Sequence, residues 1–361
     1  MTDGPSPHTG PVEKSQGPPL IGITMGDPAG IGAETIVKAL SDAEVRGLGR
    51  FVVYGIESLL DRASGRAGIP PFWFRVPREE ILNVNSGVIV SDFEEFEGYP
   101  WTPGIAGSEG GRASLRFLDD AIAAARGGTI DAIVTGPINK TSWKLAGCRF
   151  PGHTEKLADA LGVKRYNMGF VGGGLRLVLA SAHVGLFALR NRFSIGMVFQ
   201  PIELLHNALV NWFGLTEPRI AVAGLNPHAG EAGAFGDEET RVIGPAIEMA
   251  RNLGIDAQGP FPPDTMFIPS RRCRFDGFVA MYHDQGLIPI KMLAFDTAVN
   301  VTLGLPIIRT SVGHGTAFDI ADGNAADAGS MKEAIRLACH LARRTRTWET
   351  CSESDALTHN A

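Results

Sequence analysis

The chain has 361 residues, of which 44% are hydrophobic and 20% are charged, enough for two ordinary domains or one large α/β unit. A formal net charge of -6 argues against nucleic acid as a partner, because binding to the phosphate backbone needs a concentrated positive surface. The four cysteines, Cys148, Cys273, Cys339 and Cys351, show no C-x-x-C spacing and are too few for a disulfide framework. No apolar run reaches the length of a membrane span, so we expect a cytoplasmic protein.

The two ends of the chain lack the pattern of folded protein. Residues 1–19 have neither the basic start nor the apolar core of a signal peptide, and we expect them to form a disordered tail. We also expect residues 346–361 to be loose. Between the ends, short apolar runs alternate with turns and helical periods, which predicts strand-helix alternation in a parallel α/β fold.

Six buried strands and six helices are predicted along the chain. The strands are predicted at residues 20–25, 51–54, 131–135, 175–182, 219–224 and 275–281. The helices are predicted to start near Ile31, Ala113, Ile138, Ile202, Glu238 and Ser330, the last of them ending near Arg344. In open α/β sheets, ligands bind where strands end in loops, and we expect the site there.

The first such loop reads G-D-P-A-G-I-G at residues 26–32 and opens a helix after a clear strand. Its backbone N–H groups can face an anion at the helix N-terminus. However, the segment lacks the third glycine of the dinucleotide fingerprint, and no acidic residue stands where the ribose partner is expected. A simple tight turn explains the segment equally well.

Three of the nine histidines, His183, His228 and His283, stand at or just past the ends of apolar strands. A single histidine in such a place is more often structural. Three at equivalent positions predict convergence on one metal ion, with water or substrate completing its shell. Neutral imidazoles favour Zn, Co or Fe over Mg, and a metal beside an alcohol lowers the pKa of the hydroxyl group.

Further polar residues are candidates for proton transfer and for binding anions. Asp264 and Asp284 can orient metal ligands or accept a proton, although an aspartate in such turns is often a cap. Lys291 lies in an otherwise apolar segment, where it can hold a phosphate or carboxylate or donate a proton, or can be an ordinary surface lysine.

Two other segments suit anion recognition. Arg309 follows a strongly apolar run, where a guanidinium group can bind carboxylate or phosphate with two hydrogen bonds. His153 and Thr154, within G-H-T-E, open another predicted helix and can reach an anion at its positive end, although a capping box explains Thr154 nearly as well.

Seven segments in the same order resemble the 4-hydroxythreonine-4-phosphate dehydrogenase family of vitamin B6 biosynthesis. The resemblance extends from Ile21 to about Leu341 and is carried by ITMGDPAGIGAE, TGPINK, PGHTE, GLNPHAGEAGAFGDEE, GPFPPDTMF, AMYHDQGLIPIK and VNVTLGLPIIRTSVGHGTAFDIA. It implies a homodimer with the active site between subunits and a divalent ion held by three histidines from both chains. The matching ligands are His183, His228 and His283. The matching substrate contacts are His153, Thr154, Lys291, Asn300 and Arg309.

The segments MGDPAGIGAE and HGTAFDIA also resemble parts of the isopropylmalate and isocitrate dehydrogenases, which bind dinucleotide without a Rossmann fingerprint. This likeness implies a two-domain, three-layer α/β/α fold. The expected first domain comprises residues 20–136 and 292–345, and the second comprises residues 137–291. The likeness also implies a cofactor loop made of His314, Gly315, Thr316, Ala317 and Asp319.

The cofactor that this loop implies is NAD, with NADP as the alternative. Asp319 falls where an acidic residue accepts from the ribose 2'-hydroxyl in NAD-using relatives, and a carboxylate there repels the 2'-phosphate of NADP. The next residues read A-D-G-N-A-A-D where the pattern has A-G-K-G-K-A-D, so two expected basic side chains are absent.

The implied reaction oxidises the C3 alcohol of 4-phosphooxy-L-threonine and then decarboxylates the β-keto acid to 3-amino-2-oxopropyl phosphate. Zinc is the expected metal, with Co and Mg as alternatives, and Lys291, Asp264 and Asp284 are the candidates for proton handling. Other substrates within this reading are 4-phospho-D-threonate, 4-phospho-D-erythronate and, less favoured, an aromatic cis-dihydrodiol. Two hypotheses from other functional classes are a three-histidine metallohydrolase and a non-catalytic phosphometabolite-binding protein.

Overall fold

The computed structural model describes residues 17–77, 81 and 87–358, except for the side chains of Asp92 and of residues 346–358. Within these residues, twelve strands form one sheet in the order β3-β4-β2-β1-β5-β12-β11-β6-β7-β10-β8-β9. Most of the expected N-terminal tail, residues 1–16, lies outside the described residues. The described residues contain no helix that is long and apolar enough to cross a membrane.

The strands have the following bounds, in chain order: β1 (Leu20–Thr24), β2 (Arg50–Gly55), β3 (Trp73–Val76), β4 (Val88–Asp92), β5 (Ala132–Thr135), β6 (Asn167–Gly172), β7 (Leu175–Leu179), β8 (Ile220–Ala223), β9 (Ala257–Phe261), β10 (Gly277–Ala280), β11 (Val299–Leu303) and β12 (Ile308–Ser311).

The longer helices are α1 (Gly32–Ser41), α3 (Glu57–Ala67), α4 (Ser108–Arg126), α6 (His153–Ala160), α8 (Ile195–Asn211), α9 (Gly244–Asn252), α12 (His283–Ala294) and α13 (Gly329–Thr358). The shorter ones are α2 (Ala43–Arg46), η2 (Glu94–Phe96), α5 (Lys140–Leu145), α7 (Leu186–Leu189), η3 (Pro227–Gly233), η4 (Glu239–Ile243), α10 (Pro263–Met266) and α11 (Pro269–Arg272).

The strand order reverses at β1, which pairs in parallel with β2 on one side and with β5 on the other. The chain first moves outward from β1 to β2 and β4, and then returns past β1 to β5. Because parallel crossovers are right-handed, this reversal places α1 and α3 on one face of the sheet and α4 on the other. The carboxyl ends of β1 and β5 therefore bound a crevice of the kind in which open α/β sheets bind ligands.

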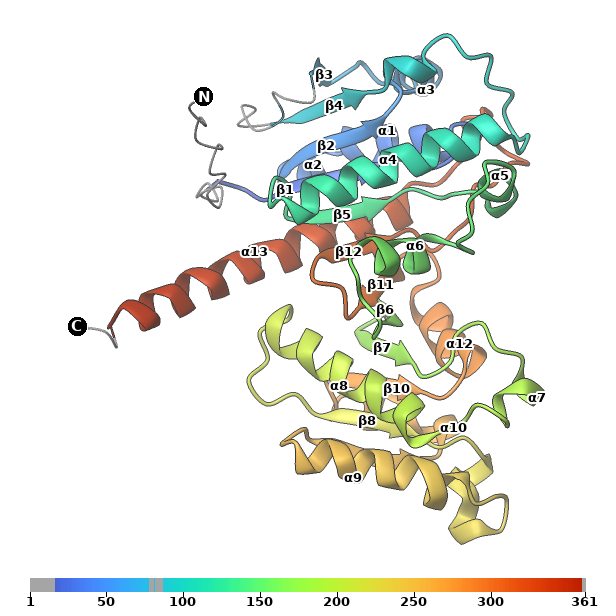
Figure 1. Ribbon diagram of the computed structural model, residues 1–361, viewed down its shortest axis with the longest axis vertical. Helices are drawn as coiled ribbons and strands as arrows, with labels where there is room; N and C mark the ends of the chain where they lie inside the picture. The colour runs from blue at the N-terminus through green and yellow to red at the C-terminus, as the bar shows by residue number, and fades with distance from the viewer. Residues whose placement is uncertain (1–16, 78–80, 82–86, 359–361) are drawn as a thin grey trace, which may run out of the picture.

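The other half of the sheet is also covered on both faces. The two faces of β10 contact different helices. Gly277 lies against Leu205 and Leu209 of α8. Ala280, on the other face, lies against Gly286 of α12. This alternation is what a parallel strand buried on both faces requires. The fold is therefore the expected α/β class, with helices on both sides of a central sheet (Figure 1).

Strands from the two expected domains occupy separate parts of the sheet. Those of the first domain run from β3 to β11 in the strand order, and those of the second run from β6 to β9. The two sets meet where β11 pairs antiparallel with β6, in a register that places Asn300 opposite Phe170. One continuous sheet thus crosses the expected boundary, and the division into domains 20–136 with 292–345 and 137–291 stays a proposal.

All six predicted strands are present, but two of the predicted helix starts and the last helix end are wrong. Helix α4 starts at Ser108 rather than near Ala113, and α8 starts at Ile195, capped by the hydroxyl of Ser194, rather than near Ile202. Helix α13 continues to Thr358 instead of ending near Arg344, so the segment expected to be loose is helical up to that residue. No glycine or proline interrupts residues 345–358, and nothing in the sequence ends the helix there. Figure 1 shows this end of α13 leading away from the sheet.

Candidate active site

A cleft opens at the carboxyl ends of the parallel strands β5 and β12. It encloses about 730 Å³ of empty space, including space open to solvent. Its walls come from the end of β5 and the following turn, the start of α6, the antiparallel strands β6 and β11, and the loop after β12. The sequence-predicted residues that line it are His153, Thr154, His183, Asn300, Arg309, His314 and Gly315.

Arg309 lies on β12 at the base of this cleft, with only 3% of its surface exposed. Its guanidinium group donates to the hydroxyl of Thr135 at 2.7 and 3.2 Å and to the hydroxyl of Thr302 at 3.1 Å. Burial lowers the pKa of Arg309 to about 10, although the negative charge of Glu155 favours the charged form. The group therefore stays a cation at neutral pH.

The partners of Arg309 are neutral, so its charge is not compensated by direct contact. Among the described residues, no carboxylate forms a salt bridge with it. Removing a guanidinium group from water is costly unless an anion or a full set of acceptors meets it. The base of the cleft is thus suited to a phosphate or carboxylate group of a ligand.

Helix α6 begins at the cleft with His153 and Thr154, directly after Gly152. The positive end of the helix dipole favours an anion at this position. Burial lowers the pKa of His153 well below its usual value, and the charge of Arg309 lowers it further. His153 is therefore neutral at pH 7, able to donate a hydrogen bond from one ring nitrogen and accept one at the other.

Two buried polar atoms around the cleft have no hydrogen-bond partner among the residues that the structure describes. They are Oδ1 of Asn300 and Nε2 of His314. Buried side-chain polar atoms are nearly always paired in native proteins, and orphans of this kind indicate a missing ligand or water. Both residues line the cleft, so its polar lining is incomplete without an occupant.

The predicted metal ligands divide into a pair and a single residue. The rings of His183 and His283 have centroids 6.2 Å apart. Nδ1 of His283 lies 2.6 Å from a carboxylate oxygen of Asp284, which orients the ring and leaves Nε2 for a ligand. His228 instead lies beside Phe235, with ring centroids 6.0 Å apart.

Within the described residues of one chain, no group of three histidine, cysteine or acidic side chains is placed to hold a metal ion. The pair His183 and His283 fits two positions of the expected site. A third ligand has to come from elsewhere, and its supply by a second copy of the chain stays a prediction.

The loop that carries His228 has an unusual backbone. Residues 228–232 all have positive φ, between 42° and 82°, and four of them are not glycine, which costs about 1–2 kcal/mol per residue. Glu239 holds the start of this loop, because its carboxylate accepts the backbone N–H groups of Leu225 and Asn226, each at 2.7 Å. The exposed imidazole of His228 is thus presented by a firmly anchored loop.

Several predicted site residues do not line the cleft. Lys291 is exposed on α12, and Asp264 is exposed on α10, which contacts the His228 loop. In the cofactor loop, Thr316 is buried against Gly30 and Asp319 is exposed. The residues outside the described lining of the cleft are His228, Asp264, His283, Asp284, Lys291, Thr316, Ala317 and Asp319.

The structure also adds residues that were not among the candidates. Thr135 holds Arg309, and Lys140 and Glu155 line the cleft. Lys140 ends the TGPINK segment and Glu155 ends PGHTE, so both lay within motifs that carried the family resemblance. Thr135 begins the same TGPINK segment, but it was not named as a site residue, because a threonine inside a buried strand is usually structural.

The chain is similar to known proteins over most of its length. A 4-hydroxythreonine-4-phosphate dehydrogenase of Desulforapulum autotrophicum is 45% identical over 89% of this chain and 94% of the relative. A D-threonate 4-phosphate dehydrogenase of Cupriavidus necator is 43% identical over 90% of this chain and 98% of the relative. The crystal structure of 4-hydroxythreonine-4-phosphate dehydrogenase from Klebsiella pneumoniae superimposes with a TM-score of 0.83 at 38% identity, covering 91% of this chain and 99% of that one.

These likenesses define the class of protein first: the chain is a dehydrogenase. The family description "Pyridoxal phosphate biosynthetic protein PdxA" matches residues 49–338. The chain belongs to the PdxA family.

We predict that Arg309→Met weakens binding of the anionic substrate while the protein stays folded. Each charge-assisted hydrogen bond contributes about 1.5–3 kcal/mol, so kcat/KM should fall by about tenfold to about 150-fold for each bond lost. Arg309→Lys is the matched control, which keeps the charge and loses the fork geometry, and its loss should be smaller. Unchanged kcat/KM in Arg309→Met would contradict the role of Arg309 as the anion contact.

We also predict that the neutral state of His153 makes the fold less stable in acid. Because its folded-state pKa is lowered, the unfolded chain binds a proton at a pH where the folded chain does not. The contribution of His153 is complete above the unfolded pKa of about 6.5 and is lost as the pH falls toward the folded value.

Urea midpoints at pH 7.5 and at pH 5.5 test this expectation. His153→Gln should lose less stability than the unchanged protein between the two values, while the other histidines titrate alike in both. An identical loss in the two proteins would rule the explanation out.

Proposed function

We propose that the protein catalyses the metal-dependent, NAD-linked oxidation of the C3 alcohol of 4-phosphooxy-L-threonine, with decarboxylation to 3-amino-2-oxopropyl phosphate. The observation that carries this proposal is the buried charge of Arg309, which no carboxylate among the described residues contacts directly, in a cleft that also contains His183 and His314. An anion contact, a candidate metal ligand and the start of the expected cofactor loop thus share one cavity.

In this proposal the chain's own residues bind and orient the substrate. Arg309 and the start of α6, with His153 and Thr154, hold its anionic groups. Asn300 uses its unpartnered Oδ1 to accept a hydrogen bond from a hydroxyl or amino group. The oxidised product is a β-keto acid, which loses carbon dioxide readily.

The proposed metal ligands are His183 and His283 of one chain and His228 of another. When bound, a divalent cation supplies Lewis-acid chemistry that lowers the pKa of the alcohol. Zinc suits three neutral imidazoles best, and Co and Mg are the alternatives. Asp284 fixes the orientation of the His283 ring through its 2.6 Å contact.

The proposed cofactor loop begins at His314 and Gly315, in the wall of the cleft. When bound there, NAD supplies the hydride acceptor. Lys291, Asp264 and Asp284 stay the proposed groups for proton handling. Lys291 and Asp264 are exposed in a single chain, so in this proposal both act in a site that a second copy completes.

The proposed homodimer is supported by apolar side chains exposed near the histidine pair. On α12, which starts at His283, Ile288 is 59% exposed and Met292 is 82% exposed, and nearby in the chain Phe295 is 74% exposed. Phe187, on the short helix after His183, is 98% exposed. Large apolar side chains exposed together mark association surfaces in monomers.

The second candidate substrate is 4-phospho-D-threonate, with 4-phospho-D-erythronate beside it. A relative named D-threonate 4-phosphate dehydrogenase is nearly as similar to this chain as those named for 4-hydroxythreonine-4-phosphate. The two substrates differ in a single group next to the carboxylate. A cis-dihydrodiol is less favoured, because the uncompensated charge of Arg309 and the α6 N-terminus suit a phosphorylated anion.

A substrate panel tests the proposal directly. NADH formation is followed with 4-phosphooxy-L-threonine, 4-phospho-D-threonate, 4-phospho-D-erythronate and a cis-dihydrodiol, each with Zn²⁺, Co²⁺ and Mg²⁺. We expect the highest kcat/KM with 4-phosphooxy-L-threonine and loss of activity after chelation. No activity on any member would refute the proposal, and a higher kcat/KM with 4-phospho-D-threonate would select the alternative.

The shared metal site predicts complementation between two inactive variants. His183→Ala and His228→Ala should each be inactive alone. After they are mixed, unfolded and refolded together, about a quarter of the wild-type activity should return, since half of the dimers are mixed and each mixed dimer keeps one intact site. No recovery in mixed dimers, verified by differently sized tags, would contradict a site built from both chains.

A further inference from the structure

A second pocket lies on the other side of the expected cofactor loop. It is formed by the turn before α1, by α3, and by the segment after the loop, and it encloses about 490 Å³ of empty space, including space open to solvent. Its lining includes Gly30, Glu34, Trp101, Arg62, Arg66 and Asp322. No residue of this pocket is part of the lining of the substrate cleft.

One loop connects the two cavities. His314 and Gly315 line the substrate cleft, and Asp322 and Asn324 line the second pocket. Between them, the carbonyl of Thr316 accepts the backbone N–H of Ile31 at 3.1 Å. A Cβ on Gly30 would lie only 3.0 Å from Thr316, so the glycine permits this close packing of the loop on the start of α1.

A dinucleotide that follows this loop has a defined direction. Its nicotinamide ring must lie beside the substrate, in the cleft, because hydride transfer requires contact between them. The adenosine end then reaches the second pocket. Trp101 is among the residues that line that pocket, and aromatic rings stack favourably on flat aromatic groups. The residues present thus fit the adenosine end of NAD.

The charged groups of this pocket centre on Asp322. Its carboxylate forms ion pairs with both Arg62 and Arg66 of α3. The side chain of Asp322 is 23% exposed, against 41% for Arg62 and 40% for Arg66. A carboxylate has about four lone-pair positions, so two arginine contacts leave it able to accept a further hydrogen bond from a ligand.

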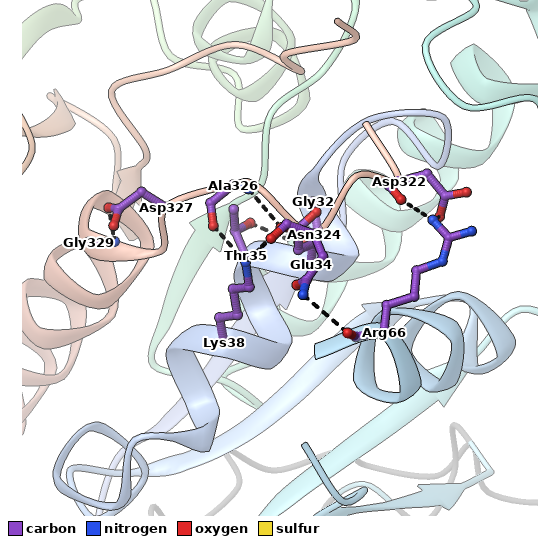
Figure 2. A network of polar contacts seen from close by, with 10 residues as sticks. All are labelled: Gly32, Glu34, Thr35, Lys38, Arg66, Asp322, Asn324, Ala326, Asp327 and Gly329. Carbon is purple, nitrogen blue, oxygen red and sulfur yellow. Dashed lines mark hydrogen bonds and ion pairs between the residues drawn. The ribbon is translucent and has the colours of Figure 1, made fainter. Parts of the chain in front are cut away.

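The backbone around Asp322 is anchored by other residues, as Figure 2 shows. Lys38 donates to the carbonyls of Asn324 and Ala326, at 3.0 and 2.9 Å. The buried carboxylate of Glu34 accepts the N–H of Ala326 at 2.7 Å. Asn324 donates to the carbonyl of Arg66 at 3.1 Å. The carboxylate of Asp322 is therefore held in one position rather than left on a free loop.

Asp319, the residue expected to contact the ribose, is less well placed. It is exposed, and it does not belong to the described lining of either cavity. The pocket instead contains Asp322, the next acidic residue along the same loop.

We propose that Asp322 determines the preference for NAD over NADP, by accepting the ribose 2'-hydroxyl and repelling a 2'-phosphate, with Arg62 and Arg66 as its positioning residues. This assignment rests on the proposed use of NAD.

Binding of NAD⁺ and NADP⁺ to the full-length protein, measured by calorimetry in the presence of Zn²⁺, tests the assignment. Asp322→Asn removes the charge and suits the backbone, since φ of Asp322 is 67° and asparagine adopts positive φ more readily than most residues. We expect the ratio of Kd for NADP⁺ to Kd for NAD⁺ to fall by about tenfold or more, because like-charge repulsion is lost. Asp322→Gly, which also accepts positive φ, serves as a second variant if Asp322→Asn does not fold.

Asp319→Asn is the matched control, an equally conservative change three residues away, and it should leave the ratio unchanged. An equal weakening of both dinucleotides in Asp322→Asn, or a change of the ratio in Asp319→Asn, overturns the assignment. If the unchanged protein binds neither dinucleotide, the proposed use of NAD fails first. Tight NAD⁺ binding with a ratio insensitive to Asp322 overturns only the role of Asp322.

Discussion

The guanidinium group of Arg309 joins three neighbouring strands at the base of the site. Arg309 lies on β12 and donates to Thr135 on β5 and to Thr302 on β11. A buried cation is tolerated only when its N–H groups are satisfied, and two threonine hydroxyls satisfy part of this need without neutralising the charge. The same side chain therefore stabilises the packing of the central strands and keeps a positive charge available to a ligand.

Much of the sheet could be predicted because parallel strands buried on both faces read as continuous apolar runs. Five of the six predicted strands, including 20–25 and 131–135, pair only in parallel, and the sixth, at 175–182, has one parallel and one antiparallel neighbour. The strands β6, β11 and β12, which were not predicted, each have an antiparallel neighbour at the joint of the sheet, and the parallel strands β3, β4 and β9 were missed as well. A pattern of strand followed by helix does not describe a hairpin such as β6–β7, which turns directly at Gly173 and Gly174 with positive φ.

The candidate site was predictable to the extent that its residues follow strand ends within one chain. His153, Asn300 and Arg309 gather in one cleft as expected. His228 and Lys291 are exposed and lie outside the described lining of that cleft. A sequence motif records that a residue is needed at a site, but not which copy of the chain supplies it. Thr135 was not predicted as a site residue, because its role becomes visible only through its contact with Arg309.

The loop after β12 differs in sequence from the A-G-K-G-K-A-D pattern of the related dehydrogenases. The way it is anchored shows why its backbone conformation does not depend on that sequence. Lys38 and Glu34, both on α1, bind backbone atoms of Asn324 and Ala326 rather than their side chains. Backbone-directed contacts of this kind do not depend on which side chains the loop carries. The residues at 322–325 are therefore free to differ in charge while the loop keeps its position, and the charge at the pocket is then set jointly by Asp322 and by the arginines of α3.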